Sequence, residues 1–172
     1  MSAFVPNSNP QALLTNILQL YLSNQVSIEY MNMREASVYG EAARAVWLKS
    51  AIVSKQLDNS LGAIHGIGLA EYMVLLNLAS SPTQSLRRVD IADAISRTAS
   101  AITRMLMPME KIGLVEKESS ARDARVSLVK ITKAGLEVFE HASLTLNAKA
   151  EGVLGGLSRK QANDLVGLLA KV

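Results

Sequence analysis

The chain has 172 residues, a formal net charge of +3, two histidines and no cysteine. These counts exclude disulfides, thiol redox sensing and cysteine-bound zinc, and two histidines are too few for a histidine-rich metal cluster. Apolar residues make up 49% of the chain but aromatic residues only 4%, and this usage favours a mainly α-helical protein. Polar residues interrupt the uncharged stretch 10–28, so we expect no membrane-spanning segment and a cytoplasmic protein. No metal or cofactor is expected either.

The first part of the chain is expected to be helical after a short tail. Residues 1–10 are the expected flexible tail, and apolar residues then recur at approximately helical spacing over 11–31 and again over 35–63. A shorter helix is expected over 69–78, before the turn-rich segment 80–85. The long N-terminal helices carry apolar faces that a small central lobe cannot cover alone, which predicts an interface between two copies of the chain.

The stretch VDIADAISRTASAITRMLMPMEKIGLV, residues 89–115, predicts two short helices joined by a tight turn at Ser96, Arg97 and Thr98. Thr98 is the expected N-cap of the second helix. Five apolar residues of this helix are expected to share a buried face, namely Ile102, Met105, Leu106, Met109 and Ile112. Four polar residues fall on or near the opposite face, namely Ser100, Thr103, Arg104 and Lys111, and Met107 is expected to turn outwards.

The rest of the chain, residues 114–172, predicts a β-hairpin and two more helices. Strand-like residues flank a charged tip over 114–132, which is typical of a hairpin. Thr132 is the expected N-cap of a long helix that ends near Leu154. Ser158 and Gln161 have the spacing of a capping box at the start of the last helix. Its apolar face is formed by Leu165, Leu168, Leu169 and Val172.

The distribution of charge predicts a polyanionic partner for the middle of the chain. Ten of the 18 basic residues lie between Leu86 and Lys133, against six acidic residues in the same segment. An ordinary solvated surface is the alternative explanation, and it is the better one for Lys111, Lys117 and Lys130. A helix that presents short hydroxyl side chains and an arginine fits the DNA major groove, where arginine pairs with guanine. The hairpin would then be a wing that reaches the adjacent minor groove.

Three stretches stand in the order and spacing of one known family. HGIGLAEYMVLLNLA, the 89–115 stretch above and RDARVSLVKITKAG together resemble the MarR family of winged helix-turn-helix regulators over residues 65–135. The resemblance implies a triangular homodimer that presents two recognition helices to double-stranded DNA at a pseudo-palindromic operator. It also implies a small-molecule effector, typically a phenolic or aromatic compound, that releases the DNA.

The resemblance also implies which residues contact DNA. Ser100, Thr103 and Arg104 match the recognition-helix positions, whereas Asp123 and Arg125 match the D-x-R of the wing, in which the arginine enters the minor groove. The full set of expected DNA-binding residues is Arg97, Thr98, Ser100, Thr103, Arg104, Arg122, Asp123 and Arg125. Trp47, His65 and Tyr72 are candidates for an effector pocket, although packing in the core or an interface explains them more simply.

The expected fold is therefore mainly α with a small β-hairpin wing. A winged helix-turn-helix lobe over 69–131 lies between N-terminal helices over 11–68 and C-terminal helices over 132–172, and both helical regions are expected to form the dimer. The expected function is a sequence-specific DNA-binding transcriptional regulator, a repressor rather than an activator.

Two other classes of protein remain as alternatives. Some methyltransferases begin with a winged helix, but nothing after Thr132 offers a glycine-rich cofactor loop or the alternating strands of a nucleotide-binding sheet, so we expect no enzyme activity. The second alternative is a winged helix used only for dimerisation or protein contacts. Such a module would need neither Arg104 nor a basic wing.

Overall fold

The computed structural model describes residue 19, residues 37–119 and residues 127–172. The chain divides into two units, Met1–Leu48 and Lys49–Val172. The expected tail and the first expected helix lie outside the described residues, apart from Gln19. Within the described ranges no single helix is long and apolar enough to cross a membrane, and only a helix pair bent by 79° passes that test.

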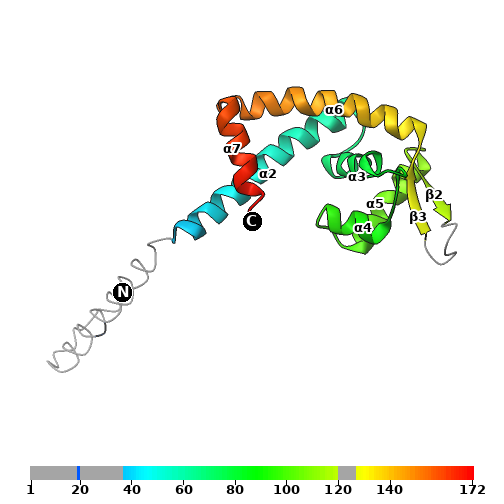
Figure 1. The fold of residues 1–172 in the computed structure, drawn as a ribbon, viewed down its shortest axis with the longest axis horizontal. Coiled ribbons are helices and arrows are strands. Elements are labelled where there is room, and N and C mark those ends of the chain that lie inside the picture. Colours follow the sequence, from blue (N-terminus) through cyan, green and yellow to red (C-terminus); the bar gives the residue numbers. More distant parts are fainter. Residues whose placement is uncertain (1–18, 20–36, 120–126) are drawn as a thin grey trace, which may run out of the picture. The chain divides into compact units, whose positions relative to one another are not determined.

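Helix α2 (Val38–His65) is the longest helix of the described part, and α3 (Leu69–Ser80) follows it after a short turn (Figure 1). Gly66 has a φ of +69°, a conformation that favours glycine and lets the chain turn sharply out of α2. The backbone N–H of Leu69 donates to Oδ1 of Asp58 at 2.7 Å. Asp58 on α2 therefore satisfies one of the free N–H groups at the start of α3.

The predicted pair of short helices is confirmed. α4 (Arg88–Ala94) and α5 (Ala99–Lys111) flank the turn, and Thr98 is the N-cap of α5. The prediction that Ile112 belongs to the buried face is wrong, because its side chain is 63% exposed. α5 ends at Lys111, and Ile112 takes a non-helical conformation, so the helical spacing no longer determines where this side chain points.

The predicted hairpin is confirmed, but it is part of a three-stranded sheet. β2 (Val115–Ser119) and β3 (Ser127–Ile131) form the hairpin, and β1 (Ser85–Arg87) pairs with the other edge of β3. All pairs are antiparallel, with Leu86 opposite Val129. β1 was missed because three residues after a turn are too few to show the alternation that signals a strand. It exists because β3 offers a free edge for hydrogen bonding.

Helices α6 (Lys133–Leu154) and α7 (Arg159–Leu169) follow the sheet as predicted. The Thr132 hydroxyl accepts from the N–H of Gly135 at 3.0 Å and therefore caps α6. At the start of α7 the predicted capping box of Ser158 and Gln161 is present in both directions. The apolar side chains of α7 are exposed, so the described part of this chain does not cover the face that was expected to pack.

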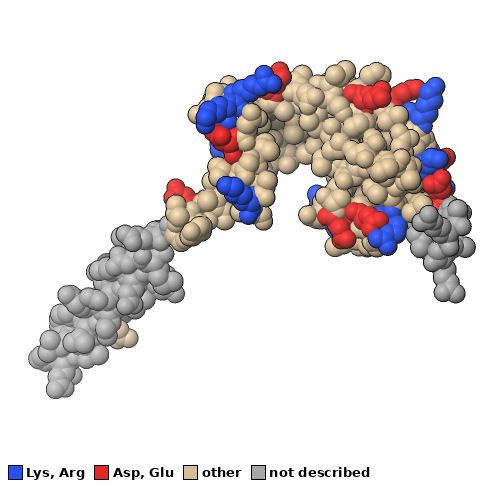
Figure 2. Space-filling model, viewed as in Figure 1, with Lys and Arg blue, Asp and Glu red and all other residues tan. Residues whose placement is uncertain are grey.

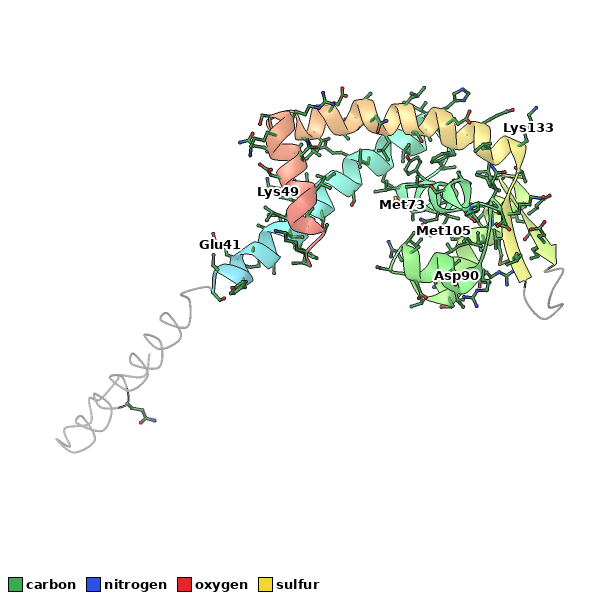
Figure 3. All side chains as sticks on the ribbon, in the orientation of Figure 1. Glu41, Lys49, Met73, Asp90, Met105 and Lys133 are labelled. Carbon is green, nitrogen blue, oxygen red and sulfur yellow. The ribbon has the colours of Figure 1, made fainter. Side chains whose placement is uncertain are left out.

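One hydrophobic core holds the lobe together. Its fully buried members come from every layer of the lobe and include Leu61 of α2, Leu75 of α3, Ile91 of α4, Ile102 of α5 and Ala142 of α6. The partly buried methionines Met73 and Met105 pack against this core from α3 and α5 (Figure 3). Because α5 shares the core with four other helices, its orientation in the lobe is fixed by packing.

Candidate nucleic-acid interface

A tight turn fixes where α5 begins. Ser96 adopts a φ of +53°, and the N–H of Arg97 donates to the carbonyl oxygen of Ala92 at 2.9 Å. In the next residue, Thr98, Oγ1 accepts from the N–H of Ala101 at 3.2 Å. The turn and the cap therefore hold the first turn of α5 in one place, at the surface of the lobe.

Helix α5 has one buried face and one exposed face. On the buried face the exposed fractions are 0% for Ile102, 5% for Leu106 and 2% for Met109. The exposed face carries Ser100, Thr103 and Arg104. As the sequence predicted, three apolar anchors hold the helix and leave its polar side chains at the surface.

The polar side chains on the exposed face keep hydrogen-bonding capacity for a partner. The Thr103 hydroxyl donates to the carbonyl oxygen of Ala99 at 3.0 Å, which leaves its oxygen free to accept. The hydroxyls of Ser100 and Thr98 lie 3.1 Å apart. Arg104 has five N–H donors and forms no ion pair within residues 37–119 and 127–172.

Arg87, the N-cap residue of α4, forms an ion pair with an acidic residue. Arg87 donates to both carboxylate oxygens of Asp90, at 2.6 and 2.8 Å. These hydrogen bonds lower the pKa of Asp90 below its usual value and raise that of Arg87. Acidic and basic side chains accordingly lie side by side over α4 (Figure 2). Both partners are well exposed, so the pair adds little stability, but it ties up this cation.

The hairpin holds two further ion pairs. Lys117 lies 3.0 Å from Glu110, and Lys130 lies 3.4 Å from Glu118. Glu110 is the only acidic residue of α5, and its carboxylate is engaged with the strand behind the helix. The exposed face of α5 is therefore positively charged.

A cavity of about 450 Å³ adjoins the turn before α5. Its apolar wall comes mainly from α3, with Leu69, Ala70 and Met73, together with Ile95 from the end of α4. Its polar lining comes from Ser54, Lys55 and Asp58 of α2 and from Arg97 of the turn. Arg97 therefore belongs to both the turn and the cavity.

Comparison with known proteins identifies the lobe. A sequence model of the MarR family matches residues 67–127. Residues 67–127 therefore match the MarR family in sequence, and we call them the MarR-family domain. The match spans α3, β1, the two helices that flank the turn, and β2, so it includes the whole of α5 with its exposed face.

Solved structures show that the fold extends beyond this domain. AbsC, a MarR family transcriptional regulator from Streptomyces coelicolor, is 23% identical with a TM-score of 0.69, over 79% of this chain and 93% of that protein. A second MarR family regulator from S. coelicolor, solved in complex with DNA, is 22% identical with a TM-score of 0.71, over 80% and 87% of the two chains. A mutant MarR from E. coli, complexed with operator DNA, is 22% identical with a TM-score of 0.68, over 79% of this chain and 98% of that protein. This chain has the MarR winged-helix fold.

The MarR-family domain brings most of the predicted DNA-binding residues to one surface. The turn and the first half of α5 carry five of them, all exposed, namely Arg97, Thr98, Ser100, Thr103 and Arg104. The other three, Arg122, Asp123 and Arg125, lie outside the described residues. Contact of these eight residues with DNA stays a prediction.

The three candidate effector-pocket residues lie in different settings. Tyr72 is buried, stacks on Phe139 and hydrogen-bonds to Ser143 at 3.1 Å, while His65 hydrogen-bonds to Thr145 at 2.8 Å. Both thus link α2 or α3 to α6. Trp47 belongs to the other unit, and its side chain is 71% exposed. None of the three lines the cavity described above, and their role in an effector pocket stays a prediction.

Asp58 was not among the residues predicted to have a functional role. Its carboxylate lines the cavity and accepts from Leu69 at the start of α3, so it positions the domain's first helix. The two residues are 11 apart in the chain and sit on different helices. A carboxylate that caps a neighbouring helix has no fixed spacing from it, so no sequence motif would have indicated this contact.

Proposed function

We propose that the protein is a sequence-specific transcriptional regulator that acts in the cytoplasm and places α5 in the major groove of double-stranded DNA. The observation that carries this proposal is the exposed face of α5, where Ser100, Thr103 and Arg104 follow a capped tight turn and no free acidic side chain lies among them. Arginine pairs with guanine, and short hydroxyls contact phosphates or base edges. The DNA in two of the similar structures supports the same assignment.

We further propose that two copies bind one pseudo-palindromic operator. Five large apolar residues at the C-terminal end of the chain, from Leu165 onwards, are exposed in the single chain, namely Leu165, Val166, Leu168, Leu169 and Val172. Helical spacing puts Leu165, Leu168 and Leu169 on one face of α7, and an exposed apolar face of this kind marks an interaction site. A second copy that covers it would present a second α5 to a half-site about one helical turn away.

The regulator is proposed to act as a repressor that a ligand releases. A dimer that covers a promoter blocks access to it, and a small aromatic or phenolic ligand would shift the population towards a form that does not bind. The cavity beside the turn offers such a ligand an apolar wall of Leu69, Ala70, Met73 and Ile95, and its polar lining of Ser54, Lys55, Asp58 and Arg97 includes two cations against one carboxylate. A rise in the operator dissociation constant when a phenolic acid is added, lost on changing Lys55→Ala, would support this site, because Lys55 lines the cavity and is not among the expected DNA-binding residues.

The proposed function is tested by binding to the DNA upstream of the protein's own gene. We expect tight binding to that duplex, weaker binding to a scrambled duplex, two chains per operator, and a steep loss of affinity with salt because lysine and arginine displace counterions from phosphates. Fluorescence anisotropy over a salt series measures all of these. Equal, salt-insensitive binding to both duplexes would reject DNA recognition and favour a winged helix used for protein contacts.

A further inference from the structure

We propose that Met107 recognises a thymine in the operator by packing against its C5-methyl group, and so helps to determine sequence specificity. This inference rests on the proposed function, in which α5 enters the major groove. Met107 is not part of the core, since its side chain is 63% exposed. The sequence analysis predicted that this side chain turns outwards but assigned no role to it.

Met107 lies on the same face of α5 as the exposed polar residues. Residues three and four apart lie on the same face of an α-helix. Met107 is three residues after Arg104, four after Thr103 and four before Lys111, and all three are exposed. Met107 therefore lies within the row of side chains that faces DNA in the proposed complex, between two cations.

The surface around Met107 is positively charged. The only acid of α5, Glu110, is 3.0 Å from Lys117 of β2, whereas Lys111 forms no ion pair within the described parts of the chain. A polyanion that approaches Arg104 and Lys111 must pass over the side chain between them. Duplex DNA is thus a better occupant for this surface than an apolar protein surface, which would have to desolvate both cations.

The chemistry of the side chain then selects the base. A methionine thioether is a flexible apolar group and only a weak hydrogen-bond acceptor, so it gains little from the polar edges of guanine, adenine or cytosine. Among the four standard bases, only thymine presents a methyl group in the major groove. Isolated exposed methionines are common, and it is the place of this one in the DNA-facing row that gives it a role.

The helix geometry also limits where the thymine lies. The rise of about 1.5 Å per residue puts the Cα of Met107 roughly 4.5 Å along the axis from that of Arg104. One base-pair step is about 3.4 Å. The thymine should therefore lie about one or two base pairs from the base that Arg104 contacts, once in each half-site.

Thymine-to-deoxyuridine replacement tests this contact, because uracil pairs like thymine but lacks the methyl group. Each thymine of the operator is replaced in turn, and binding is measured for the parent chain and for Met107→Ala. For the parent we expect one symmetric pair of positions at which the replacement weakens binding about three- to fivefold, the effect of losing one buried methyl group. Met107→Ala should lose that sensitivity at those positions and keep the rest of the profile.

Two further variants make the result specific. Lys111→Ala removes a cation from the same face, so it should weaken binding to every duplex and leave the deoxyuridine profile unchanged. Met107→Leu restores an apolar side chain and should recover most of the sensitivity. Circular dichroism checks that each variant is folded, which we expect because neither side chain is buried.

The outcomes separate this inference from the function on which it rests. If the parent chain shows no preference for its operator, the proposed function fails. If the parent prefers its operator but Met107→Ala has the same deoxyuridine profile, or no thymine position is sensitive, the thymine contact is refuted and the DNA-binding function stands. Loss of the sensitivity at one symmetric pair, with recovery in Met107→Leu, supports the inference.

Discussion

Gly135→Ala is expected to destabilise the protein by about 2–4 kcal/mol, because the first turn of α6 packs directly on the chain before β2. A Cβ at this position would overlap the carbonyl oxygen of Leu114 and lie 3.0 Å from Cγ1 of Ile131. The backbone cannot shift to relieve the overlap, since the N–H of Thr132 donates to that same oxygen at 3.1 Å and its hydroxyl donates to the carbonyl of Gly113 at 2.6 Å.

Gly152 in the same helix provides the matched control. A Cβ at Gly152 would meet no atom within 4 Å, so the substitution to alanine only removes the entropic cost of glycine in a helix. Gly152→Ala should therefore stabilise the protein, by up to about 1 kcal/mol. Urea unfolding of both variants measures the two effects. Similar stabilities for Gly135→Ala and the parent chain would mean that α6 does not pack on Leu114 as described.

Arg104→Ala is expected to weaken operator binding by about 1–3 kcal/mol, the range for loss of a bidentate contact with guanine. The loss should depend on DNA sequence, with a much smaller effect on a scrambled duplex, because a base contact rather than a phosphate contact is removed. Arg104 is exposed on α5 and forms no ion pair with the described residues, so the variant should stay folded.

Arg159→Ala is the control for the charge that Arg104→Ala removes. Arg159 is an exposed arginine at the start of α7, outside the MarR-family domain. The Arg159→Ala variant should bind the operator almost as tightly as the parent chain, and any small loss should not depend on the DNA sequence. Anisotropy titrations of both variants on operator and scrambled DNA make the comparison. Equal losses for the two variants would indicate that Arg104 contributes only net charge and recognises no base.

The sequence predicted the elements whose signals are local. Thr98, Thr132 and the pair of Ser158 and Gln161 cap helices through atoms only three residues away, so spacing alone locates them. The two faces of α5 were also predictable, because three buried apolar residues at helical spacing define the side that packs. The exposed polar face then follows from the same period.

The features that the sequence did not predict depend on distant parts of the chain. β1 is a strand because β3 offers it an edge more than 40 residues later. Asp58 reaches the start of α3 because the sharp turn after α2 brings Leu69 back next to it. Helical spacing predicted that Ile112 lies on the buried face. This spacing applies only within the helix, and α5 ends one residue before Ile112. Each depends on tertiary packing or on the point at which an element ends, which periodicity does not encode.

Directed cleavage from the first residue of α5 tests the central claim that this helix enters the operator. The chain has no cysteine, so Ala99→Cys can carry a single iron chelate that cuts nearby DNA. Ala99 is exposed at the start of α5, and His141→Cys on the exposed side of α6 is the control. We expect cleavage by the Ala99→Cys conjugate in two clusters, one in each half-site, about 10 base pairs or a multiple of this apart, and none from the control. If the Ala99→Cys conjugate binds the operator but does not cut it, or if both conjugates cut equally, α5 is not the helix that contacts DNA.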